Sequence, residues 1–104
     1  HLEILHPANR LERLELDGDS LVIGRRSPQR PVDLDLGPYD PNGYVSRQHA
    51  RLARGPTGLT ITDLRSSNGT FLNGSRLPEG VPFHLQHGDI IRMGQVELKL
   101  VLTR

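Results

Sequence analysis

Residues 96–103 read VELKLVLT, an alternation of apolar and polar side chains that is interrupted only at Val101. Alternation with a period of two places successive side chains on opposite faces of a β-strand. This segment is therefore predicted to be a half-buried strand. Its apolar face is expected to consist of Val96, Leu98, Leu100 and Leu102.

Shorter runs of the same kind recur along the chain, separated by turn dipeptides such as Asp17-Gly18 and Asn73-Gly74. The further strands predicted in this way are residues 2–5, 9–16, 20–24, 32–36, 49–54, 59–64, 70–72, 82–85 and 89–93. Residues 9–16 could also form a short helix, but the alternation of Leu14 and Leu16 favours a strand. Many short strands about 8 to 12 residues apart predict an all-β sandwich or barrel.

The length and composition predict one small domain over residues 1–104. A chain of 104 residues buries roughly 60 to 70% of its unfolded surface, which is enough for one core. No apolar run is long enough to insert into a membrane, and no signal segment opens the chain. The absence of cysteine fits a reducing compartment, so a cytoplasmic location is expected. Because the chain begins with His1 rather than Met, we expect it to be a module of a longer protein.

The charge is nearly balanced, with 13 basic and 12 acidic residues, but Lys99 is the single lysine among the basic ones. Arginine offers a planar set of donors that suits carboxylate and phosphate. A few arginines could therefore form an anion pocket while the others pair with the acidic residues, although codon bias explains most of them more simply. A nucleic-acid surface would need excess positive charge and stacking aromatics, so no nucleic-acid partner is expected.

Three clusters of polar residues precede or follow predicted strands. Gly24-Arg25 ends one strand, Ser46-Arg47-Gln48-His49 begins another, and residues 66–74 read SSNGTFLNG. Ser46 and His49 lack the orienting acid and the nucleophile-elbow glycines of a catalytic pair, so we expect no catalysis. A buried His49 that hydrogen-bonds loop backbone, with Ser46 capping a turn, is the simpler interpretation. Each Asn-Gly pair is typical of a tight turn.

In this order the three clusters resemble the pattern of the forkhead-associated (FHA) family, which runs Gly-Arg, Ser-x-x-His and Ser/Thr-x-Asn-Gly-Thr-x-x-Asn-Gly. The matching residues span 21–94. The resemblance implies a sandwich of about eleven strands that binds a threonine-phosphorylated protein or peptide on the loops at one end. It implies no catalytic residue, cofactor or metal. His84 and His87 are accordingly interpreted as a surface pair, because no further ligand completes a metal site.

The resemblance also implies a role for each matching residue. Arg25 would supply a guanidinium to the phosphate, Ser46 a hydroxyl donor and Arg47 a second charged contact. Ser67 would assist at the phosphate, and Asn68 would bind the main chain of the ligand. The residues expected to support the site are Gly24, His49, Gly69, Thr70, Asn73 and Gly74. A phosphothreonine carries about −1.5 to −2 charges, so fixed donors matter more than a high net charge.

Several alternatives remain open at this point. The same fold could serve as a phospho-independent docking or dimerisation module, and an enzyme using Ser46 and His49 is a more distant possibility. Ligand specificity is expected to lie in residues 26–45 and 75–87, where Tyr39 and Tyr44 could form apolar walls. Arg30 and Arg76 could select an acidic ligand residue, or they could be ordinary surface charges, which is the preferred interpretation.

Overall fold

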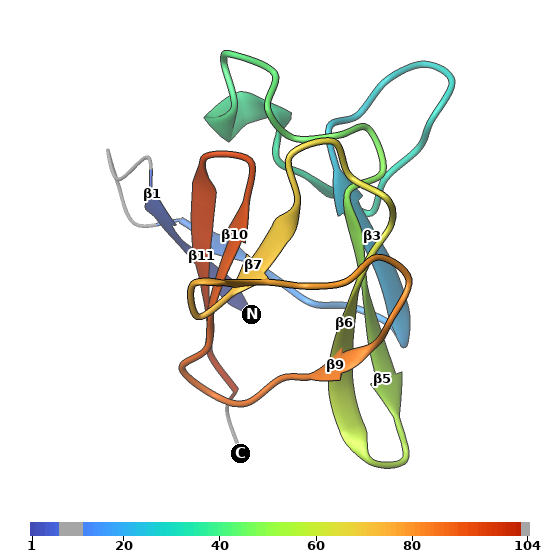
Figure 1. Cartoon of the computed structure of the whole chain (residues 1–104), viewed down its shortest axis with the longest axis vertical. Coiled ribbons are helices and arrows are strands. Elements are labelled where there is room, and N and C mark those ends of the chain that lie inside the picture. Colours follow the sequence, from blue (N-terminus) through green and yellow to red (C-terminus); the bar gives the residue numbers. More distant parts are fainter. Residues whose placement is uncertain (7–11, 103–104) are drawn as a thin grey trace.

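The structure, a computed structural model, describes residues 1–6 and 12–102, which form two β-sheets packed face to face (Figure 1). One sheet has six strands in the order β2-β1-β11-β10-β7-β8, and the other has five in the order β4-β3-β5-β6-β9. The predicted all-β sandwich of about eleven strands is therefore confirmed. The strands are β1 (Leu2–His6), β2 (Arg13–Leu14), β3 (Ser20–Gly24), β4 (Leu34–Asp35), β5 (Ala50–Gly55), β6 (Gly58–Asp63), β7 (Thr70–Leu72), β8 (Ser75–Arg76), β9 (Phe83–His84), β10 (Ile90–Met93) and β11 (Val96–Leu100).

The strands at the edges of both sheets are short. All four of them, β2, β8, β4 and β9, contain two residues. Short edge strands leave few unpaired backbone groups that could pair with another chain. The strand pairs are antiparallel except β3 and β4, which run parallel with Ile23 opposite Leu34. The long connection between those two strands carries residues 25–33 to one end of the sandwich.

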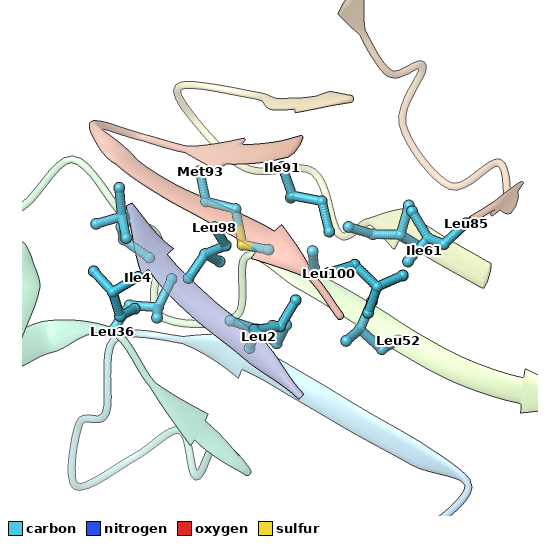
Figure 2. Packing of buried hydrophobic residues seen from close by; sticks show 14 of the residues in the cluster. Leu2, Ile4, Leu36, Leu52, Ile61, Leu85, Ile91, Met93, Leu98 and Leu100 are labelled. Carbon is cyan, nitrogen blue, oxygen red and sulfur yellow. The ribbon is translucent and has the colours of Figure 1, made fainter. Parts of the chain in front are cut away.

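Alternate residues of the longer strands fill the space between the sheets (Figure 2). From the six-stranded sheet, Leu98 and Leu100 of β11 are fully buried. Facing them from the other sheet are Ile23, Leu52 and Ile61, each of which is at most 1% exposed. Burial of side chains of this size contributes about 1.5 to 3 kcal/mol each. This core holds the strand ends from which the loops described below extend.

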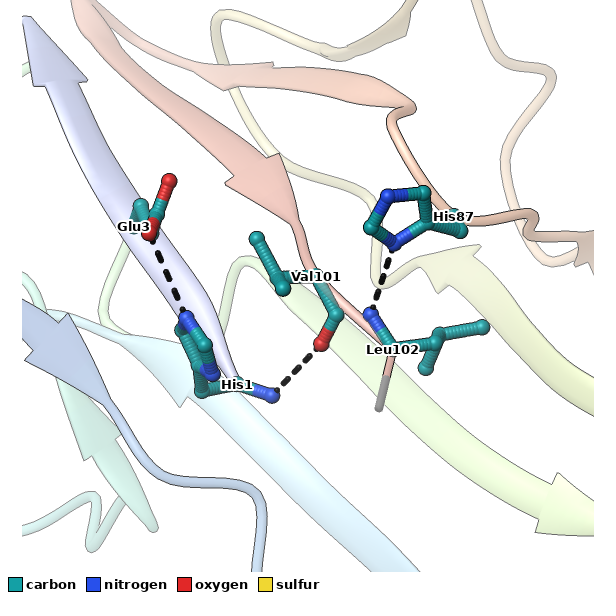
Figure 3. Close-up of polar contacts among 5 residues, drawn as sticks. All are labelled: His1, Glu3, His87, Val101 and Leu102. Carbon is teal, nitrogen blue, oxygen red and sulfur yellow. Dashed lines mark hydrogen bonds and ion pairs between the residues drawn. The ribbon is translucent and has the colours of Figure 1, made fainter. Parts of the chain in front are cut away.

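The predicted apolar face of the last strand is wrong at Leu102. Strand β11 ends at Leu100, and Leu102 is 43% exposed. Val101 still exchanges backbone hydrogen bonds with His1, at 2.9 and 3.0 Å, but the next residue turns away from β1, because the Leu102 N–H donates to Nδ1 of His87 at 3.0 Å (Figure 3). Side-chain alternation therefore continues in the sequence beyond the point where the sheet stops.

Other strand predictions differ in extent. The strand predicted over 32–36 covers only Leu34–Asp35, and Gly37–Tyr39 is a 3₁₀ turn in which Pro38 occupies an early position that needs no amide donor. The strand predicted over 82–85 covers Phe83–His84. Of the strand predicted over 9–16, β2 contains Arg13–Leu14, and residues 7–11 lie outside the described residues. Strand β8 was not predicted.

Candidate functional site

The three motif clusters meet at one end of the sandwich. The loops that connect β3 to β4, β4 to β5 and β6 to β7 lie together at the top of Figure 1. Between them is a hollow of about 470 Å³. It is lined by Arg25, Arg30, Ser46, Arg47, Gln48, Leu64 and Ser67. Four of the five residues expected to contact the ligand therefore line one hollow, and the fifth, Asn68, follows Ser67 in the chain.

Gly24, at the end of β3, allows two of these loops to touch. A Cβ atom at this position would lie 2.1 Å from the carbonyl oxygen of Arg47, so no larger residue fits without a backbone shift. The next residue, Arg25, donates its backbone N–H to the carbonyl oxygen of Ser46 at 3.0 Å and its Nε–H to that of Val45 at 3.2 Å. The guanidinium is thus anchored by one of its five N–H groups, and the others are available to a ligand.

A buried aspartate shapes the loop that leads into Ser46. Asp40 is 6% exposed, and its two carboxylate oxygens accept the backbone N–H groups of Tyr44 at 3.0 Å and Val45 at 2.8 Å. The Gly94 turn packs on the same loop, because a Cβ on Gly94 would lie 2.8 Å from the Tyr44 backbone. Asp40 is not among the site residues predicted from the sequence. The Asp-Pro-Asn-Gly stretch that it opens is typical of a turn closed by an aspartate side chain.

His49 joins two of the loops from inside the protein. It is fully buried; its Nδ1 accepts the backbone N–H of Ser46 at 3.0 Å, and its Nε2–H donates to the carbonyl oxygen of Gly69 at 2.9 Å. Burial lowers the pKa of His49, outweighing the hydrogen bond to Gly69, which raises it. The imidazole is therefore neutral and has both nitrogens occupied. It has no nitrogen free to accept a proton from the Ser46 hydroxyl, which excludes this pair as nucleophile and base.

The hydroxyl of Ser46 is oriented by the third loop. Its oxygen accepts the backbone N–H of Ser67 at 3.1 Å. The hydroxyl proton does not take part in that bond and is free to donate into the hollow. Asn68, which is exposed, donates its Nδ2–H to the carbonyl oxygen of Tyr44 at 2.8 Å. The carbonyl oxygen of the Asn68 side chain is left available to accept a hydrogen bond from a ligand main chain.

A second buried aspartate, also missed in the sequence, holds this third loop. Asp63 is 2% exposed and accepts hydrogen bonds from the backbone N–H of Ser66 at 3.2 Å, from the Ser66 hydroxyl, and from the Thr70 hydroxyl at 2.7 Å. Thr70 therefore helps to hold this loop through Asp63. Gly69 has a φ of 86°, a left-handed conformation that favours glycine.

Asn73 and Gly74 lie at the opposite end of β7 from Ser67 and Asn68. Their φ values of 50° and 88° form the turn between β7 and β8. The Asn73 side chain donates to a carboxylate oxygen of Asp89 at 3.0 Å and accepts the N–H of Ile90 at 2.9 Å. These two residues hold β7 against β10, and they do not touch the hollow.

The charged side chains that line the hollow are all positive. Three arginines line it, no carboxylate of the described residues does, and none of the three forms an ion pair within that part of the chain. The nearby Asp33 and Asp35 accept backbone N–H groups instead, from Val22 at 2.8 Å and from Arg26 at 3.0 Å. For the remaining arginines the sequence left two explanations open, pairing with the acidic residues and codon bias. Within residues 1–6 and 12–102 the ion pair is that of His1 with Glu3. Arg92, for example, lies over the Phe71 ring at 3.9 Å.

The family model of the FHA domain matches residues 21–94. The chain belongs to the FHA domain family. It is 41% identical over 84 residues to the ABC transporter ATP-binding/permease protein Rv1747 of Mycobacterium tuberculosis, covering 81% of this chain and 9% of that protein. It is 34% identical over 82 residues to Protein FraH of Nostoc sp., covering 79% of this chain and 28% of FraH. The chain thus spans less than a third of these relatives.

Solved FHA structures share the whole architecture. The FHA domain of the CT664 protein from Chlamydia trachomatis superposes with a TM-score of 0.80 at 28% identity, covering 99% of this chain and 96% of that one. A structure from an analysis of phosphothreonine-dependent FHA domain interactions superposes with a TM-score of 0.74 at 26% identity, covering 99% of this chain and 95% of that one. The FhaA FHA domain, solved in complex with the intracellular domain of Rv3910, superposes with a TM-score of 0.70 at 28% identity, covering 94% of each chain. FHA domains are protein-recognition modules. None of the described helices is long and apolar enough to cross a membrane.

Proposed function

We propose that this chain binds peptides and proteins in a phosphothreonine-dependent manner, with the phosphate held in the hollow between the three loops. The observation that carries the proposal is the convergence of Arg25 and Arg47 with the Ser46 hydroxyl in a space that no carboxylate of the described residues enters. A doubly charged phosphate ester with three acceptor oxygens matches this set of donors.

The donors of the hollow are sufficient for a useful affinity. Hydrogen bonds to charged groups contribute about 1.5 to 3 kcal/mol each. Two or three of them therefore supply most of the roughly 8 kcal/mol that corresponds to a micromolar dissociation constant. The Asn68 amide, fixed by Tyr44, would accept a main-chain N–H and hold the ligand extended beside the hollow.

In this proposal the chain serves as a recognition module without catalysis, in signalling or assembly in the cytoplasm. Both nitrogens of His49 are engaged by backbone groups, which supports the absence of a Ser46–His49 reaction centre. We also propose a preference for phosphothreonine over phosphoserine. One buried methyl contributes about 0.8 kcal/mol, or roughly fourfold in affinity.

The test is calorimetric titration with peptides selected from an oriented phosphothreonine library. The best peptide is compared with its unphosphorylated twin and with its phosphoserine twin at constant salt. We expect measurable binding only of the phosphorylated forms, with affinity falling as salt increases and as pH decreases through about 6, where the phosphate gains a proton. Equal affinity for the unphosphorylated twin would instead support a phospho-independent docking module.

A further inference from the structure

The hollow contains more positive charge than one phosphate requires. Arg25 and Arg47, with Ser46 and Ser67, already surround a position for the phosphate, and Arg30 adds a third guanidinium from a different loop. A hollow of about 470 Å³ falls in the range of about 300 to 1,000 Å³ that holds whole small ligands. It therefore has room for a second group beside the phosphate.

Arg30 is placed at the hollow by a tight turn. Ser27 and Arg30 exchange backbone hydrogen bonds at 3.3 and 3.4 Å, and the Ser27 hydroxyl accepts the Arg30 N–H at 3.1 Å. Pro28 stands at the second position of this turn, where its fixed φ is favourable. These contacts involve only the backbone of Arg30, so they set the position of residue 30 whatever its side chain is.

The side chain of Arg30 reaches across to the loop of Ser46. Its Nη1 donates to Oε1 of Gln48 at 3.4 Å, and the other guanidinium N–H groups remain available. Arg76, the other arginine considered for this purpose, is outside the hollow and packs on Gly69, where a Cβ would lie 2.8 Å from its Nε. The structure thus places Arg30 at the hollow and Arg76 outside it, a difference that the sequence does not show.

We propose that Arg30 forms a second anion subsite, and that the preferred ligand carries an acidic side chain close to the phosphothreonine. This inference rests on the proposed function. Three residues of extended peptide span about 10 Å, so an anion that shares the hollow belongs to a residue within about three positions of the phosphothreonine. A carboxylate and a second phosphate have the same relevant chemistry, and the experiment distinguishes them.

The experiment measures dissociation constants by fluorescence anisotropy for a set of phosphothreonine peptides with an otherwise neutral sequence. One series places a single Glu at each of the three positions before and after the phosphothreonine, and a second series places phosphoserine there. For the wild-type chain, at least one position should raise affinity about fivefold over the neutral phosphopeptide, the size expected of a partly exposed ion pair. A gain with Glu shows that a carboxylate is sufficient for this subsite, and a gain with phosphoserine alone shows that it requires a second phosphate.

The variant Arg30→Gln should reduce that preference to less than twofold while changing the affinity for the neutral phosphopeptide by less than twofold. Arg30→Lys, which keeps the charge, should retain part of the preference. Arg51→Gln is the matched control, since it removes the same charge from an exposed position of β5 away from the hollow. Thermal unfolding should be unchanged in Arg30→Gln, because the turn is held by the backbone.

Two results would overturn the inference while leaving the proposed function intact. One is equal binding of neutral and acidic peptides by the wild type. The other is an equal loss for both kinds of peptide in Arg30→Gln, which would assign Arg30 to the phosphothreonine itself. Failure of the proposed function is recognised by comparing the neutral phosphopeptide with its unphosphorylated twin. If the two bind equally well, both proposals are wrong.

Discussion

Strand β7 has the same dipeptide at both ends, Asn68-Gly69 before it and Asn73-Gly74 after it, and the two asparagines differ in what they bind. Asn73 uses both ends of its amide within the protein, on Asp89 and on the backbone of Ile90. Asn68 is exposed and uses only its N–H, on the carbonyl oxygen of Tyr44. One asparagine is committed to the fold, and the other keeps an acceptor for a ligand.

The difference comes from the neighbours rather than from the dipeptide. Asn73 lies beside β10, whose backbone pairs with β7 from Leu72 to Thr70. Asn68 lies beyond the end of the sheet, where the loop containing Tyr44 is its neighbour. An Asn-Gly pair therefore predicts a turn in both places, but the function of each turn depends on segments that are distant in sequence. Four experiments test this contrast between the loop end and the far end of β7.

The largest effect is expected at the loop end, from Arg25→Gln. Loss of two charge-assisted hydrogen bonds should weaken phosphopeptide binding at least about 100-fold, or roughly 3 kcal/mol. Calorimetric titration measures this loss, and Arg51→Gln serves as the charge-matched control. A loss of less than threefold would mean that the phosphate does not bind at the loop end.

At the far end, Asn73→Ala should lower the free energy of unfolding by about 2 to 3 kcal/mol, because two side-chain hydrogen bonds are lost and alanine is strained at a positive φ. Urea denaturation measures the change. Phosphopeptide affinity of the folded protein should stay within twofold of the wild type.

Asn73→Gly separates the two causes of this loss. Glycine tolerates the positive φ, so the glycine variant should lose only about 1 kcal/mol, from the missing hydrogen bonds. If either variant lost binding without losing stability, the assignment of Asn73 to the fold alone would be wrong.

Asn68→Ala should show the reverse pattern. We expect phosphopeptide affinity to decrease about tenfold, near 1.4 kcal/mol, since the ligand main chain loses its partner. The free energy of unfolding should change by less than about 0.5 kcal/mol, as is usual for an exposed position. Both quantities are measured on the same preparation. If Asn68 had a purely structural role, the variant would lose stability and keep its phosphopeptide affinity.

The smallest effect concerns pH at the loop end. The pKa of His49 in the folded chain lies below the 6.5 of the free side chain, so the unfolded chain binds more protons between the two values. The stabilisation is complete above pH 6.5 and is lost as the pH falls through the folded-state pKa. The free energy of unfolding should therefore fall as the pH is lowered from 6.5.

Urea denaturation of the wild type and of His49→Asn at several pH values measures the contribution of His49 to the free energy of unfolding. The variant should be less stable at neutral pH but should lack this part of the pH dependence. An identical pH dependence in the two proteins would show that His49 is not the group responsible.

The sequence was informative where a pattern is local and long enough. The alternation of β5, β6, β10 and β11 predicted these strands, and the ordered motifs identified residues that do meet at one end. The two-residue strands β2, β4, β8 and β9 are too short for alternation to be visible, and for this reason their extents were wrong or missed. Leu102 shows the opposite error, because the alternation continues after strand pairing has ended.

The burial of the two aspartates could not be recognised from the sequence, although the turn that Asp40 opens could. Asp40 is followed by turn residues, and Asp63 ends a strand, so both resemble ordinary surface carboxylates. Their burial is possible because each carboxylate accepts hydrogen bonds from backbone or hydroxyl groups. For Asp63 one of those partners, Thr70, is seven residues away, and only the fold brings the two together. The same applies to Arg30 and Arg76, whose difference depends on where each loop passes.

Asp40 and Asp63 each hold one loop of the site, His49 joins these two loops to each other, and the backbone N–H of Arg25 joins the third loop to Ser46. Such a preorganised site leaves little conformational entropy for the protein to lose when a ligand arrives, and the cost of ordering falls mainly on the peptide. Association should then be fast and governed by long-range electrostatic attraction, while differences between good and poor peptides should appear in how long each complex survives.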